Sequence, residues 1–174
     1  KTHYLLKNPV EGETAPCVMV EEKIGVAGEY YVGATYDTSR RTPVILFSKA
    51  GGIDVESSGS TQRLNVDCST GLQDWMIRDM LKKAGVAQEK IVKLADIVRR
   101  TYGCFLAEDC KTLEINPLAE TTDGKFIAVD VAIELDGDAG FRHKERNFSE
   151  RTTKQLTGRE AAVKKANSAD YRGT

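Results

Sequence analysis

The segment Leu113-Glu-Ile-Asn-Pro-Leu-Ala-Glu-Thr-Thr-Asp-Gly-Lys-Phe-Ile-Ala-Val-Asp130 decides the fold of this chain, because its pattern predicts a β-hairpin. Two apolar-rich runs flank a Thr-Asp-Gly sequence that suits a three-residue loop, closed by a glycine in the left-handed region. In that loop Thr121 pairs with Lys125, so Asn116 falls opposite Asp130. A two-residue loop would shift the pairing by one residue and put these two side chains on opposite faces. We predict the first register.

This register divides the hairpin into a polar face and an apolar face, because directly opposed residues share a face. Glu114, Asn116 and Asp130 then lie together on the polar face. The apolar face carries Ile115, Ala119, Ile127, Val129 and Val131.

The amide oxygen of Asn116 and the carboxylate of Asp130 suit a hard divalent cation. Mg²⁺ prefers oxygen ligands and usually takes one or two of them from protein, leaving the rest to water and phosphate. The pattern therefore indicates a metal–nucleotide site. A simpler interpretation stays open from the residues alone: Asn116-Pro117 ends a strand, and Glu114 and Asp130 face solvent.

The composition is that of an ordinary globular chain. Its 174 residues include 25 Lys or Arg and 26 Asp or Glu, for a net charge of −1, which gives no electrostatic case for binding nucleic acid or a membrane surface. No apolar run approaches the length of a membrane span and no signal-peptide pattern begins the chain, so we expect a cytoplasmic protein, or a mitochondrial matrix protein in a eukaryote. The four cysteines lack metal-ligand spacing, which favours free thiols.

The first half of the chain predicts an antiparallel β region. Strands are expected at residues 17–21, 29–37 and 43–48, and the polar turn at residues 37–41 joins the last two as a hairpin. Residues 57–69 are polar and predict a connection to the helical half.

Two amphipathic helices follow, one from Thr70 to just before Gly85 and one from about Gln88 to Ala107. Helices over an antiparallel sheet make an α+β lobe, here residues 1–137. Residues 138–174 form a basic extension with a short helix at residues 157–167. The apolar stripes predict core positions at Leu72, Trp75, Met76, Met80, Leu81, Ile91, Leu94, Ala95, Val98, Tyr102, Cys104, Phe105 and Leu106.

Three motifs resemble the ATP-grasp β subunits of the succinate–CoA ligase family and its acyl-CoA synthetase relatives. They are Glu114-Ile-Asn-Pro-Leu118 followed by Asp130 at a strand end, the segment Val18–Asp37, and Gly51-Gly-Ile-Asp-Val-Glu56. The motifs occur in the family's order over roughly residues 18–130. The resemblance implies that the α+β lobe is the larger lobe of an ATP-grasp fold, an antiparallel sheet covered by helices.

The resemblance implies a role for each polar residue of the hairpin. Asn116 and Asp130 would hold Mg²⁺ against the nucleotide phosphates. Glu114 would be the catalytic carboxylate that meets a phosphohistidine near the nucleotide. That histidine lies on a partner α subunit, which also carries CoA.

Residues 21–29 match the hinge segment of the family, which implies a binding site for ATP or GTP. The backbone there, at Ile24, would hold the base, and Glu21 and Glu29 occupy the family's acidic positions. A carboxylate can accept two hydrogen bonds from a ribose diol, and Glu29 is the better candidate for this role.

The implied activity converts acyl-CoA, phosphate and nucleoside diphosphate into acid, CoA and nucleoside triphosphate, with succinate as the leading acid. Two alternatives stay open: a malate–CoA ligase or ATP citrate lyase-like enzyme, and a non-catalytic subunit-interface domain. The family's smaller ATP-grasp lobe and CoA-ligase domain have no counterpart in these residues, so we expect this chain alone to lack ligase activity and to bind nucleotide weakly.

Overall fold

The computed structural model describes Tyr4, residues 6–9, 17–52 and 61–145, and Ala162. The chain divides into two compact units, Lys1–Glu134 and Leu135–Thr174.

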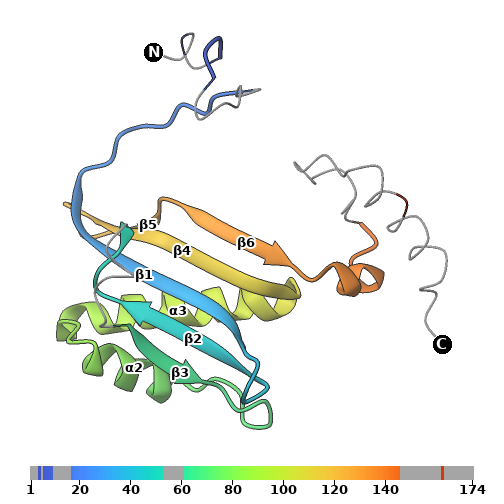
Figure 1. The fold of residues 1–174 in the computed structure, drawn as a ribbon. Helices are drawn as coiled ribbons and strands as arrows, with labels where there is room; N and C mark the ends of the chain where they lie inside the picture. Colours follow the sequence, from blue (N-terminus) through green and yellow to red (C-terminus); the bar gives the residue numbers. More distant parts are fainter. Residues whose placement is uncertain (1–3, 5, 10–16, 53–60, 146–161, 163–174) are drawn as a thin grey trace. The chain divides into compact units, whose positions relative to one another are not determined.

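The first unit is built on a six-stranded sheet (Figure 1). The strand order is β3-β2-β1-β4-β5, and β6 also pairs with β4. Strand β1 therefore lies between β2 and β4, with an antiparallel partner on each side. The strands are β1 (Val26–Asp37), β2 (Thr42–Ser48), β3 (Gln62–Asn65), β4 (Cys110–Thr121), β5 (Phe126–Ala128) and β6 (Val131–Leu135).

Helices α2 (Asp74–Lys83) and α3 (Gln88–Ala107) lie on one side of this sheet (Figure 1). Helix α3 packs against β1 and β4, while α2 packs against α3 and β3. Each large apolar side chain buried between the layers stabilises the fold by roughly 1.5–3 kcal/mol. The predicted α+β arrangement, an antiparallel sheet covered by helices, is confirmed. Fully buried side chains between the layers include Val32, Ile45, Phe47, Ile77, Leu81, Leu94, Val98 and Phe105.

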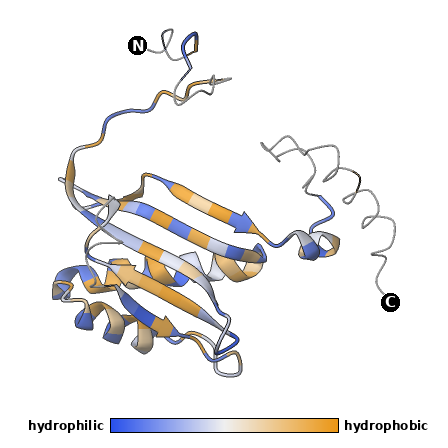
Figure 2. Cartoon of the chain, in the orientation of Figure 1, coloured by the Kyte–Doolittle hydropathy of each residue, from blue (hydrophilic) through white to orange (hydrophobic). Residues whose placement is uncertain are grey.

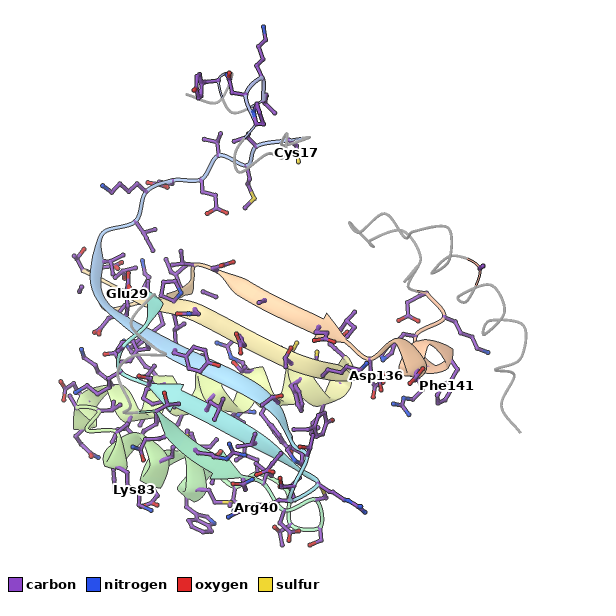
Figure 3. The ribbon with its side chains drawn as sticks, viewed as in Figure 1. Cys17, Glu29, Arg40, Lys83, Asp136 and Phe141 are labelled. Atoms are coloured by element: carbon purple, nitrogen blue, oxygen red, sulfur yellow. The ribbon has the colours of Figure 1, made fainter. Side chains whose placement is uncertain are left out.

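The predicted β1–β2 hairpin is also confirmed. Asp37 Oδ1 accepts the backbone N–H groups of Ser39 and Arg40, each at 3.0 Å, which closes the polar turn. Arg63 of β3 adds an ion pair to Asp37 at 2.6 Å. Figure 3 shows Arg40 in this turn, at the end of β1 remote from Glu29.

A bulge in β4 changes which residues face the helices. Tyr30 pairs with Leu118 and Val32 pairs with Ile115, so Asn116 and Pro117 together oppose Tyr31 alone. An extra residue in one strand reverses the alternation of faces beyond it. The helix face therefore carries Ile115 before the bulge and Leu118 after it.

This reversal corrects the predicted apolar face of the hairpin. Ala119 pairs with Glu29 and with Ile127, so both Ala119 and Ile127 lie on the face away from the helices. Ile115 and Val131 instead line a groove on the helix face. The prediction was wrong because it assumed unbroken alternation along β4.

The start of the chain and the first helix also differ from prediction. Residues 17–21 form no regular strand, and the polar connection contains the short strand β3. Helix α2 begins at Asp74 rather than Thr70, because residues 67–71 form a separate turn. The Gly71 N–H donates to the Asp67 carbonyl at 2.8 Å, and Asp67 Oδ1 accepts the Ser69 N–H at 2.7 Å.

Three predicted core side chains are exposed. Trp75 is 68 % exposed and Leu106 46 % exposed, and Cys104 lies at the surface as a free thiol. The apolar stripes of α2 and α3 are wider than the helix surface that the sheet and the neighbouring helix cover. Apolar periodicity predicts which face of a helix turns inward, but packing decides how wide a band is buried.

The second unit contains a short 3₁₀ helix, η2 (Gly137–Arg142). Asp136 caps it by accepting the Asp138 backbone N–H at 3.1 Å. Apart from Ala162, the helix predicted at residues 157–167 lies outside the described residues.

Hydropathy varies along the strands, and Figure 2 shows apolar residues over much of β2 and β6. None of the helices in the described part of the chain has the length and apolar character needed to cross a bilayer.

Candidate functional site

The hairpin of β4 and β5, which carries Asn116, has the predicted register. The Thr121 N–H donates to the Lys125 carbonyl at 2.8 Å, and the Asn116 N–H donates to the Asp130 carbonyl at 3.0 Å. Gly124 closes the three-residue loop at φ 75°, in the left-handed region. Asn116 and Asp130 are therefore directly opposed, as the loop length predicts.

Side chains within the loop reinforce this turn. Asp123 forms an ion pair with Lys125 at 2.7 Å and accepts the Thr121 hydroxyl. The hydrogen bond from Lys125 is the main cause that lowers the pKa of Asp123 to about 2, with the Thr121 hydroxyl adding to it. The loop carboxylate is thus ionised at neutral pH and holds the hairpin in register.

The sheet face away from α2 and α3 carries the site, and we call it the distal face. It is defined by Glu29, Tyr31 and Gly33 of β1 and by Glu114 and Asn116 of β4. Gly33 pairs directly with Glu114, which places the two strands' residues on the same face.

Asn116 is held on the distal face by the backbone of Gly52. Its Oδ1 accepts the Gly52 N–H at 2.6 Å, and its Nδ2 donates to the Gly52 carbonyl at 3.3 Å. This pair of hydrogen bonds fixes the plane and the orientation of the amide. A carbonyl oxygen has two lone pairs, so Asn116 Oδ1 retains one for a further donor or a cation.

Gly51 and Gly52 can lie against β1 because neither carries a side chain. A Cβ on Gly51 would stand 2.8 Å from the Tyr30 carbonyl oxygen and 2.9 Å from the Tyr30 nitrogen, which is too close for any other residue. A Cβ on Gly52 would stand 3.2 Å from Glu29 Oε2, and its φ of 73° favours glycine as well. The glycine pair thus brings Glu29 and Asn116 to one place.

Glu114 has a partner of its own on the distal face. The Tyr31 hydroxyl donates to Glu114 Oε1 at 3.1 Å. Tyr31 is only 6 % exposed. Burial is the first cause that raises the pKa of Tyr31 well above its usual range, and the negative charge of Glu114 adds to it. Tyr31 therefore remains a neutral donor at physiological pH.

The remaining predicted site residues are less tightly held. Asp130 lies in the link between β5 and β6, and its side chain is exposed. Glu21 is exposed and Ile24 is half-buried, both in the irregular segment that leads into β1. Gly25, next in that segment, accepts the Thr122 N–H at 3.1 Å, so the hairpin loop supports the segment's end.

A polar network on the opposite, helix face ties the same strands to α3. Lys90 Nζ lies 2.7 Å from Glu120 Oε2, and the Tyr30 hydroxyl donates to that oxygen at 2.9 Å. The Lys90 hydrogen bond is the main cause that lowers the pKa of Glu120. The network anchors the first turn of α3 beneath the start of β1.

The helix face also has a groove of about 320 Å³ between α3 and β4–β6. Apart from Arg100 and Thr101, its lining is apolar, including Cys104, Val131 and Ile133. It presents no carboxylate, and so it suits neither a divalent cation nor a ribose. The distal face is the better candidate site.

Asn116 and Asp130 fit Mg²⁺ by the chemistry of their donors. One offers an amide oxygen and the other an exposed carboxylate, and a cation that keeps several water ligands needs no more from protein. Among the residues that the structure describes, no group of three or more His, Cys, Asp or Glu side chains could hold a metal ion. A closed metal cage of the zinc type is therefore absent from that part of the chain.

Sequence reasoning missed the contribution of Tyr31 and Gly33 to the site. One signal was available: Gly33 interrupts a β-rich run, and an isolated glycine inside a strand often marks a close approach by another group. That signal does not say which group approaches, since Tyr31 and Glu114 meet across two different strands.

Comparison with known proteins gives a consistent result. The sequence profile of the ATP-grasp domain matches residues 3–120. The β subunit of succinate–CoA ligase (ADP-forming) from Methanocaldococcus jannaschii is 33% identical over 160 residues, which are 89% of this chain and 44% of that protein. The GDP-forming β subunit from Thermus thermophilus is 34% identical over 148 residues, covering 82% of this chain and 39% of that protein.

The fold also matches a solved structure. ATP citrate lyase from Methanothrix soehngenii, in complex with citrate and coenzyme A, superposes with a TM-score of 0.65 at 21% identity, over 86% of this chain and 35% of that one. At this identity the match establishes the architecture alone. The chain spans less than half the length of the relatives named here.

Proposed function

The chain belongs to the ATP-grasp family, and from that premise we propose that its distal face is the Mg²⁺–nucleotide site of a carboxylate–CoA ligase β subunit. The single observation that carries the proposal is the gathering of Glu29, Asn116 and Glu114 on one face, with Asp130 directly opposite Asn116 in the hairpin. The reaction is the interconversion of acyl-CoA, phosphate and nucleoside diphosphate with acid, CoA and nucleoside triphosphate. Succinate is the leading acid, because the relatives at 33–34% identity are succinate–CoA ligases.

Asn116 and Asp130 hold Mg²⁺ in this proposal. When bound, the ion neutralises phosphate charge during phosphoryl transfer. Asn116 contributes its amide oxygen already oriented by Gly52, so little side-chain freedom is lost on binding. Asp130 contributes the negative charge that favours a cation over water at this place.

Glu29, Glu21 and Ile24 bind the nucleoside. Glu29 accepts hydrogen bonds from the ribose hydroxyls at the start of β1. The backbone near Ile24 holds the base, and Glu21 occupies the second acidic position of the same segment. The relatives include ADP-forming and GDP-forming enzymes, so either base is a candidate.

Glu114 acts on a histidine supplied by a partner α subunit, which also carries CoA. A carboxylate that accepts an imidazole N–H fixes the tautomer and orientation of the ring. The protein is thus one subunit of a complex, and catalysis requires the partner. We place the complex in the cytoplasm, or in the mitochondrial matrix of a eukaryote.

Titration of the full-length β subunit with Mg²⁺–ATP and Mg²⁺–GTP, followed by calorimetry, tests the metal assignment. Asp130→Ala is expected to weaken Mg²⁺–nucleotide binding at least about tenfold, and to leave binding of the metal-free nucleotide almost unchanged. Asp96→Ala is the matched control, because it removes an exposed carboxylate from α3. Equal affinities for Asp130→Ala and the unsubstituted chain would contradict the proposal and favour a non-catalytic interface domain.

Identifying the acid substrate requires activity measurements on the full-length complex. A malate–CoA ligase or ATP citrate lyase-like enzyme is the second candidate, since the family motifs in this chain do not select the acid. Turnover measured with succinate, malate and citrate, each with CoA and nucleotide, separates these enzymes.

A further inference from the structure

Tyr31 and Glu114 meet across two neighbouring strands. Tyr31 lies on β1, two residues before Gly33, and Gly33 is the direct partner of Glu114 on β4. Glu114 is thus a diagonal neighbour of Tyr31 on the distal face, within reach of a long aromatic side chain. The hydroxyl completes the contact by donating to Glu114 Oε1 at 3.1 Å.

Gly33 provides the space that this contact needs. A Cβ at position 33 would stand 2.5 Å from the Tyr31 hydroxyl oxygen and 3.0 Å from the ring carbon that bears it. The Tyr31 ring therefore lies over the glycine, and any larger residue there would push the hydroxyl away from Glu114. The packing of Tyr31, which is 6 % exposed, prevents the ring from leaving this position easily.

We propose that Tyr31 is a positioning residue for Glu114, and that the missing side chain of Gly33 leaves the space in which the Tyr31 ring lies when its hydroxyl binds Glu114. The inference rests on the proposed function, in which Glu114 receives an imidazole N–H from the partner subunit. Tyr31 occupies one carboxylate oxygen, Oε1, and leaves Oε2 able to accept the incoming N–H. The carboxylate is thereby oriented before the histidine arrives, so less rotational freedom is lost in the reacting complex.

The first test uses the full-length β subunit assembled with its α subunit. A hydrogen bond to a charged group is worth enough that Tyr31→Phe should lower kcat about tenfold, with nucleotide KM nearly unchanged. Tyr30→Phe is the matched control, because its hydroxyl binds Glu120 on the helix face, and it should leave kcat unchanged. A Tyr31→Phe complex with unaltered kcat would overturn the inference.

A double-substitution cycle tests the role of Gly33. Gly33→Ala should lower kcat as Tyr31→Phe does, because the added carbon displaces the hydroxyl. In the Tyr31→Phe background, Gly33→Ala should lower kcat little further, since the hydrogen bond is already gone. Full additivity of the two effects on kcat would show that Gly33 acts by another route.

A spectroscopic readout is independent of turnover. Glu114→Gln removes the charge that helps to raise the pKa of Tyr31, so that pKa should fall, as followed by the ring NMR signal of ¹³C-labelled tyrosine assigned to Tyr31. Glu120→Gln should shift Tyr30 instead. If Tyr31→Phe fails to fold, Gly33→Ala decides in its place: a Gly33→Ala complex with unaltered kcat overturns the inference.

The two proposals fail in different ways. Normal phosphorylation of the partner histidine by radiolabelled nucleotide in the Glu114→Gln complex would refute the catalytic role of Glu114 itself. Loss of phosphorylation in Glu114→Gln, combined with full activity in Tyr31→Phe, would refute only the positioning role of Tyr31.

Discussion

Single residues without side chains shape the distal face. At position 51 the backbone of β1 is so close that a methyl group would meet both polar atoms of the Tyr30 peptide. At position 33 an added methyl group would overlap the Tyr31 hydroxyl, which donates a hydrogen bond to Glu114. In both cases glycine is required because other atoms fill the space of a side chain, the β1 backbone at position 51 and the Tyr31 ring at position 33. Turn chemistry, which usually explains a glycine, is not the reason.

At this residue scale, Gly51→Ala is expected to separate residues 51–52 from β1 and so to break the Gly52–Asn116 pair. Overpacking of this kind costs about 1–3 kcal/mol of unfolding free energy. Affinity for Mg²⁺–ATP should fall as well, because Asn116 loses its orientation. Urea unfolding and calorimetric titration measure the two effects.

Gly28→Ala on β1 is the control for Gly51→Ala. The carbon added there would meet the Glu120 carboxylate oxygen at 3.5 Å, an ordinary contact. It should change stability less than Gly51→Ala does. Similar losses for both variants would mean that the close approach at Gly51 does not matter.

At the scale of elements, the Lys90–Glu120–Tyr30 network joins α3 to the strands of the site. The side chain of Glu120 is 12 % exposed and that of Lys90 is 32 % exposed, so the ion pair is partly shielded from solvent. The network lies under the start of β1, on the face opposite Glu29. It therefore stabilises the part of the sheet next to residues 21–29, the segment proposed to bind the nucleoside.

This ion pair predicts a pH dependence of stability. The folded-state pKa of Glu120 is lowered, chiefly by the Lys90 hydrogen bond, from an ordinary value of 4.5. Its stabilising contribution is thus complete above 4.5 and is lost as pH falls through the lowered pKa. The difference in unfolding free energy between the unsubstituted chain and Glu120→Gln should accordingly be largest near neutrality and shrink in acid.

Urea unfolding at a series of pH values checks this dependence. Asp96→Asn on α3 is a suitable comparison, because its partners are exposed arginines and its pairs are worth little. A difference between the unsubstituted chain and Glu120→Gln that stays constant from neutral pH into acid would contradict the predicted role of the ion pair.

At the scale of the whole first unit, the sheet has two chemically different faces. Helices α2 and α3 cover one face (Figure 1) with an apolar core. The distal face carries Glu29, Glu114 and Asn116. Strand β1 has a paired neighbour on each edge, whereas β3 pairs with β2 alone in the order of the sheet. The site is thus built on the most firmly bonded strands.

Hydrogen exchange of the 174-residue chain is expected to reflect this organisation. Backbone amides in the middle of β1 and β4 should exchange slowest, and those of β3 and β6 faster. Adding Mg²⁺–ATP to the full-length β subunit should slow exchange at the start of β1 and at Gly52, with no effect on α2. Protection confined to α2 and α3 would move the nucleotide site to the helix face, and ATP with a chelator is the control for the metal.

Local chemistry made much of this structure predictable. The Thr122-Asp123-Gly124 loop determines its own turn geometry, so the pairing of Asn116 with Asp130 followed from sequence. The limits of α3, Gln88–Ala107, followed from a long helical period in the same way. The assignment of Asn116, Asp130, Glu114, Glu29, Glu21 and Ile24 to a nucleotide site came from family motifs and stays a prediction.

Contacts between segments that are distant in the chain could not be predicted from the sequence. By itself the sequence determined the hairpin register, the helix that precedes it and the α+β class, because each depends on residues close together in the chain. Only the tertiary structure decided that Asn116 and Pro117 oppose Tyr31 alone, that Gly52 orients Asn116, and that Tyr31 reaches Glu114 over Gly33. These features depend on how β1, residues 51–52 and β4 pack together, and no local pattern records the shape of a neighbour that arrives from elsewhere in the chain.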